Sequence, residues 1–64
     1  MDTRKMLFEK FEDVLTTEHE MAQAYEECLG LTEDDKVISE LSKVREDEIK
    51  HMAMARRLLE ITQG

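Results

Sequence analysis

The fold of this chain is decided by the stretch Leu29-Gly30-Leu31-Thr32-Glu33-Asp34-Asp35, which divides the sequence into two halves. Gly30 stands where a helix is expected to end in a left-handed residue, with Leu31 behind it as an apolar contact. Thr32 follows as an N-cap, and the acidic residues after it complement the dipole of a second helix. Because the connection is only about three residues long, we predict that the two helices run antiparallel as a hairpin.

Both halves carry apolar residues in a heptad pattern. In the first half, steps of four and three connect Leu7, Phe11 and Val14, and, after a gap at position 18, Met21, Tyr25 and Cys28. In the second half they connect Val37, Leu41 and Val44, and, after gaps at positions 48 and 51, Ala55, Leu58 and Thr62. A flanking apolar row makes the face wider than a two-stranded coiled coil needs, as is typical of a bundle. The pattern predicts an all-α domain over residues 1–64, with a helix over about 3–29, a turn at 30–32 and a helix over about 33–62.

Composition limits the classes of protein to which the chain can belong. Charged residues make up 39% of its 64 residues and Pro is absent, which favours long helices. Two helices bury only one stripe each, too little to offset about 1.5 kcal/mol of conformational entropy per ordered residue, so we expect an obligate oligomer. The net charge of −7 argues against nucleic acid and anionic membranes as partners. A single cysteine and the lack of a signal peptide favour a cytoplasmic location.

Three polar residues interrupt the heptads where apolar residues are expected: Glu18, Glu48 and His51. Glu48 and His51 form a Glu-x-x-His motif, whose spacing places a carboxylate and an imidazole on one helix face. Helical rise and the lean of side chains toward the helix N-terminus bring Glu18 to the same level of the hairpin. The heptad positions contain no Lys or Arg, so we expect a divalent metal ion to neutralise the buried carboxylates.

Pairing of two hairpins about a two-fold axis would complete such a site. The bundle core would then contain four Glu and two His side chains, the ligand set of dinuclear carboxylate sites in four-helix bundles. Each residue alone has a plainer interpretation. A Glu-x-x-His motif is common by chance in charged helices, an interior histidine is more often hydrogen-bonded than metal-bound, and Glu18 could set the register of the helices. The position of all three at one level favours the metal site.

The runs Glu18-His19-Glu20-Met21-Ala22-Gln23-Ala24-Tyr25 and Glu48-Ile49-Lys50-His51-Met52-Ala53 resemble ferritin-like half-bundles. The resemblance is greatest to the encapsulated ferritins and more distant to rubrerythrin. In encapsulated ferritins a Glu in the first helix is followed by Glu and His thirty and thirty-three residues later, which is the spacing found here. A tyrosine seven residues after the first Glu also matches, as Tyr25.

The resemblance implies a hairpin that dimerises into a ferritin-like four-helix bundle with a di-iron ferroxidase centre between subunits. Iron(II) would be oxidised to iron(III) by dioxygen or peroxide, for iron storage or detoxification. Glu48 would bridge the ions, His51 and Glu18 would be terminal ligands, and Tyr25 would hydrogen-bond the ligands. Rings of dimers and an enclosing encapsulin shell would be the expected assemblies, and Glu20 matches one of the family's acids that lead iron inward.

Two departures from the family leave alternatives open. Thr17 replaces the other acid of the iron path, and the sequence ends at Gly64, before the family's shell-targeting peptide. The chain is therefore expected to be either truncated or without such a signal. One alternative is a non-catalytic helical-hairpin module in which the polar residues only fix the register. Another is a structural metal site that holds manganese or zinc in place of iron.

Overall fold

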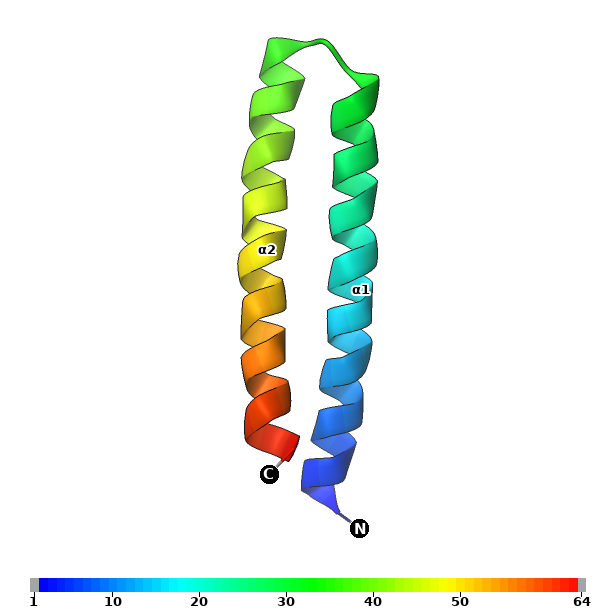
Figure 1. Ribbon diagram of the computed structural model, residues 1–64, viewed down its shortest axis with the longest axis vertical. Coiled ribbons are helices and arrows are strands. Elements are labelled where there is room, and N and C mark those ends of the chain that lie inside the picture. Colours follow the sequence, from blue (N-terminus) through cyan, green and yellow to red (C-terminus); the bar gives the residue numbers. More distant parts are fainter. Residues whose placement is uncertain (1, 64) are drawn as a thin grey trace.

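Two long helices make up the described chain. The computed structural model describes residues 2–63, with α1 over Thr3–Leu31 and α2 over Asp35–Gln63. The helices run antiparallel, side by side, and form a rod whose Cα atoms extend over 51 × 14 × 11 Å (Figure 1). The predicted all-α class is confirmed, and residues 2–63 contain no strand.

An aspartate caps the start of each helix. The Asp2 carboxylate accepts hydrogen bonds from the amides of Arg4 and Lys5, at 3.0 and 3.3 Å. The Asp34 carboxylate accepts hydrogen bonds from the amides two and three residues further on, at 2.9 and 3.2 Å. These bonds satisfy amide groups that have no partner inside the helix. The Arg4 guanidinium also donates a hydrogen bond to the Ile61 carbonyl at 2.6 Å, which connects the start of α1 to the end of α2.

The turn differs from the sequence prediction. Gly30 does not end α1, because the helix continues to Leu31 and no residue within 2–63 has a positive φ. Leu31 is 87% exposed and makes no apolar capping contact. Thr32 is the C-cap of α1, and its hydroxyl accepts a hydrogen bond from the Asp34 amide at 3.1 Å. The α2 N-cap is therefore Asp34, since its carboxylate reaches two free amides at once.

The residues that face the opposite helix repeat at steps of three and four, and we call them the hairpin seam. On α1 they are Phe8, Phe11, Leu15, Glu18, Ala22, Tyr25 and Leu29; on α2 they are Ile38, Leu41, Arg45, Glu48, Met52, Ala55, Leu59 and Thr62. Apart from Arg45, which the prediction did not include, half of this set was predicted as the seam and half as a flanking row. Within residues 2–63, only Glu48 and Ala55 are buried, at 6% and 3% exposure, so the core is thin.

A second apolar stripe has no partner within the hairpin, and we call it the apolar face. It contains Leu7, Val14, Met21 and Cys28 on α1, and Val37, Val44 and Leu58 on α2, all exposed or half-exposed. Each lies one residue before a seam residue. Because the helices are antiparallel, rows with the same offset from the seam lie on the same side of the hairpin. The row on α2 also contains His51, at the seven-residue spacing of its neighbours.

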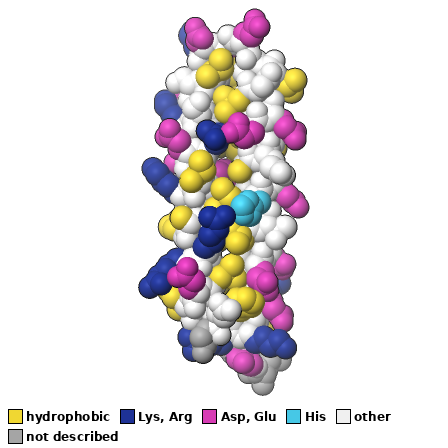
Figure 2. All heavy atoms as spheres, in the orientation of Figure 1, with side chains coloured by type: hydrophobic (Ala, Val, Ile, Leu, Met, Phe, Trp, Pro, Cys, Tyr) yellow, Lys and Arg dark blue, Asp and Glu magenta, His cyan; other side chains and the backbone are white. Residues whose placement is uncertain are grey.

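The exposed surface is otherwise rich in charge. Figure 2 shows one broad side of the rod, where hydrophobic side chains lie along the line between the helices, charged side chains border both edges, and a few charged side chains and a histidine lie across the middle. Neither helix includes a segment long and apolar enough to cross a lipid bilayer. Burial within one hairpin thus leaves much apolar surface in contact with water, which is expected of a chain that associates with a partner.

Candidate metal site

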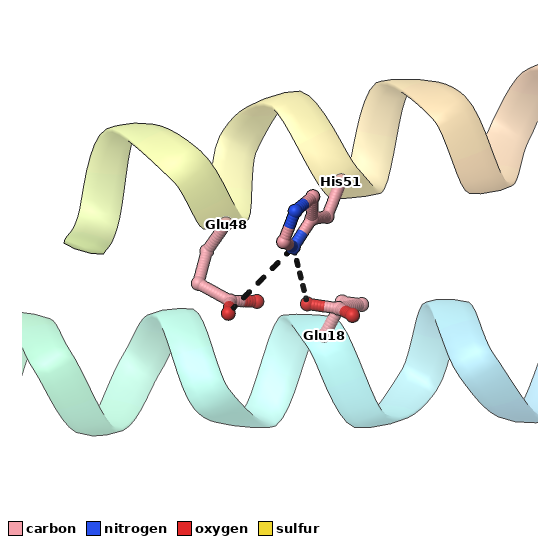
Figure 3. Close-up of side chains that lie close together, drawn as sticks. All are labelled: Glu18, Glu48 and His51. Atoms are coloured by element: carbon pink, nitrogen blue, oxygen red, sulfur yellow. Dashed lines mark ion pairs between the residues drawn. The ribbon is translucent and has the colours of Figure 1, made fainter. Parts of the chain in front are cut away.

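Glu18, Glu48 and His51 meet at the middle of the rod. Glu18 extends from α1, and Glu48 and His51 extend from adjacent turns of α2 (Figure 3). Glu18 and Glu48 are seam residues and so point at the opposite helix, whereas His51 lies one row aside, on the apolar face. The structure therefore brings together the three residues that the sequence singled out as ligands.

The distances within this group suit metal coordination. The His51 Nδ1 atom lies 3.9 Å from Glu18 Oε2 and 4.0 Å from Glu48 Oε1 (Figure 3). One ligand atom from each of the three residues lies within 4.8 Å of the other two. Two ligands at about 2.1 Å from one ion can be up to about 4.2 Å apart, so small side-chain rotations suffice to place all three on it. The same distances are too long for hydrogen bonds.

Burial leaves the two carboxylates without compensation. The Glu48 side chain is only 8% exposed and that of Glu18 is 19% exposed, while His51 is half exposed. The atoms Glu18 Oε2 and Glu48 Oε2 are buried and have no hydrogen-bond partner. A buried carboxylate oxygen without a donor is costly, and two that face each other repel. A bound cation would remove both penalties.

Nearby hydroxyl groups do not supply the missing donors. Thr16 and Thr17 lie beside Glu18 in the sequence, but their hydroxyls donate to the carbonyls four residues earlier, at 3.1 and 3.0 Å. Such bonds within the helix occupy the only donor that each hydroxyl has. A shallow hollow on α1 is lined by Lys10, Asp13, Val14, Thr17 and Glu18, so Glu18 can be reached from solvent.

One cation does lie in the hairpin seam, which corrects the sequence analysis. Arg45 is a half-buried seam residue one turn before Glu48, at a position that the predicted heptad did not include. Its Nε atom lies 2.6 Å from Glu26 Oε1, on α1, and so the guanidinium pairs with a carboxylate outside the group. The expectation that the seam contains no Lys or Arg is therefore wrong, but Arg45 pairs with Glu26 and not with Glu18 or Glu48.

Other predicted site residues lie apart from the three ligands. Tyr25 is half-buried in the seam, two turns along α1 from Glu18, and is not part of the group. Glu20 is exposed on the surface of α1. The second histidine, His19, is exposed, and its Nε2 atom lies 3.4 Å from Arg56 Nη2. His19 therefore has a neighbour of positive charge and does not join the carboxylates.

The fold and the site define a helical hairpin with a candidate metal site of two carboxylates and one imidazole. Such a donor set suits iron, manganese or zinc, because carboxylate oxygen and imidazole nitrogen bind all three. No protein-family model matches this chain, and comparisons with curated proteins and with solved structures also find no match. The resemblance to encapsulated ferritins therefore rests on the residues of this sequence.

Proposed function

We propose that this protein binds iron at Glu18, Glu48 and His51 and acts as a ferroxidase of the encapsulated-ferritin type. The observation that carries the proposal is the pair of buried carboxylate oxygens, one from each helix, without a hydrogen-bond partner beside an imidazole. A hairpin that only needed a stable core would gain from apolar residues at these positions. The unpaired acids are instead what a cation site requires.

Two copies of the chain complete the centre in this proposal. Three protein ligands do not fill the coordination shell of an iron ion, and His51 lies on the apolar face that a second hairpin would cover. Pairing of two such faces gives a four-helix bundle with four Glu and two His ligands. The four negative charges match two divalent ions. The site lies midway along both helices. Two hairpins that pair side by side, in the same or in opposite directions, therefore have their sites at the same height along the bundle.

The side chains have distinct roles in the proposed centre. Glu48 is the most buried ligand and is suited to bridge two ions, whereas Glu18 and His51 hold one ion each. Tyr25 is an apolar seam residue with a polar tip, which in the bundle hydrogen-bonds a ligand or a water molecule. Exposed Glu20 attracts iron(II) to the surface near the centre.

The proposed chemistry is oxidation of the bound substrate ion. Each iron(II) gives up one electron and becomes iron(III), and a pair of ions reduces one dioxygen molecule to hydrogen peroxide with protons from water. A single ion supplies only one electron. Two ions held at adjacent positions together supply the two electrons that reduction of dioxygen to peroxide requires. The carboxylates favour the more highly charged product, because hard anionic oxygen ligands stabilise the higher charge.

The experiment is an anaerobic iron(II) titration followed by addition of oxygen. Iron(III) formation is followed optically in wild type, in Glu18→Ala and in Glu46→Ala, which removes an exposed glutamate of α2. Fast oxidation in wild type and Glu46→Ala, but not in Glu18→Ala, supports the proposal. Equal rates in wild type and Glu18→Ala would refute it. Tight zinc or manganese binding without iron oxidation would replace it with a structural metal site.

A further inference from the structure

Arg45 holds a position from which it could neutralise the candidate metal site. It lies three residues before Glu48 on α2, and side chains at that spacing are neighbours on one helix face. Both residues belong to the hairpin seam, and the buried Oε2 atom of Glu48 has no hydrogen-bond partner. An arginine one turn away would be the ordinary partner for such a carboxylate.

The same spacing forms an ion pair elsewhere on this helix. Arg57 precedes Glu60 by three residues, as Arg45 precedes Glu48, and Arg57 Nη1 lies 3.2 Å from Glu60 Oε2. An arginine of α2 can therefore fold toward a glutamate one turn later. Arg45 instead crosses to α1, where its Nε atom is 2.6 Å from Glu26 Oε1.

We propose that Glu26 is a positioning residue for the metal site: by holding the Arg45 guanidinium, it keeps Glu48 free to bind a cation. The proposal rests on metal binding at Glu18, Glu48 and His51. Without Glu26, Arg45 turns to Glu48 and forms a charge-assisted pair there. An incoming metal ion must then displace a guanidinium as well as bind. Glu26 and Arg45 thus tune the affinity of a site that neither residue touches.

The test is a double-mutant cycle on iron(II) affinity, measured by calorimetry under anaerobic conditions. Glu26→Gln should weaken binding about tenfold, the cost of displacing one partly exposed charge-assisted pair. Arg45→Met keeps an apolar side chain in the seam and removes the competitor. In the Arg45→Met background, Glu26→Gln should have no effect on affinity. Glu60→Gln, which breaks the exposed Arg57 pair, is the matched control and should leave affinity unchanged.

Two results of the cycle would overturn the proposal. If Glu26→Gln weakens binding equally with and without Arg45, then Glu26 acts only as a distant negative charge. If it weakens binding in neither background, then Arg45 does not compete with the metal ion.

A metal-free measurement separates this proposal from the proposed function. The ¹⁵N–¹H resonance of the Arg45 Nε group should respond to Glu48→Gln in the Glu26→Gln background but not in wild type. A response in wild type, or in neither background, would show that Glu26 does not position Arg45. If wild type binds no iron(II), the proposed function fails, and the resonance still decides where Arg45 points.

Discussion

Glu18 on α1 and Glu48 on α2 each bury one carboxylate oxygen, Oε2, where it has no hydrogen-bond partner. The two acids converge from opposite helices and share one neighbour, the Nδ1 atom of His51. In the metal-free hairpin this arrangement opposes folding, because the buried carboxylate oxygens lose their hydration and gain no hydrogen bond in return. The first two predictions follow from that cost and from its removal by a metal ion.

Glu48→Gln should stabilise the metal-free protein and abolish its response to metal. The introduced amide is uncharged and can donate a hydrogen bond to Glu18, so the free energy of unfolding should rise by about 1 kcal/mol. Urea denaturation in chelator, at fixed protein concentration, measures this change. Added manganese(II) should stabilise wild type but not the variant. Glu46→Gln, at an exposed position of the same helix, should stay within about 0.5 kcal/mol of wild type.

The two histidines should differ sharply in their effect on metal binding. His51→Ala removes a proposed ligand, and loss of even an indirect partner of a metal typically costs about 10- to 100-fold in affinity, so at least about 100-fold is expected. His19→Ala should leave affinity nearly unchanged, because His19 lies beside Arg56 and outside the group. Zinc(II) calorimetry on both variants makes the comparison. Equal losses would place the metal elsewhere.

The sequence located Glu18 and Glu48 because they belong to a row that both the predicted and the observed packing place between the helices, whereas His51 was found through its spacing from Glu48. Glu18 and Glu48 interrupt the row that the predicted heptad and the observed seam have in common. The neighbouring rows on either side are both apolar, so periodicity alone could not say which packs inside the hairpin and which stays exposed. The prediction chose the row of Val14, and the structure buries the row of Leu15. Arg45 was missed for the same reason, since it lies in the row that was set aside.

The turn was misjudged because glycine has more than one use in a helix. Gly30 was expected to adopt a left-handed conformation, but the residue is helical and the three-residue connection begins only after Leu31. The Asp34 side chain decides the start of α2, and its two hydrogen bonds compete with capping by Thr32. Local motifs predicted a short connection, and the structure places it at residues 32–34.

Gly30→Ala should therefore stabilise the protein. An added Cβ at this position meets no atom within 4 Å, and the residue has helical geometry that alanine adopts without strain. Alanine is favoured over glycine in a helix interior by about 0.5–1 kcal/mol, mainly because the unfolded chain loses freedom. Urea denaturation in chelator should show a gain in that range. A loss of stability would mean that the left-handed turn predicted from the sequence forms in solution.

The last prediction concerns which side of the hairpin binds a second copy. Val14 on the apolar face and Ile49 on the opposite side of the seam are similarly exposed, at 45% and 48%. Val14→Lys should prevent dimerisation, because pairing would bury an ammonium group in an apolar interface close to the site. Ile49→Lys changes the surface by the same chemistry, but outside the proposed interface. Sedimentation equilibrium should find Val14→Lys monomeric and Ile49→Lys dimeric like wild type. The reverse result would move the interface to the other side and separate His51 from its proposed partner ligands.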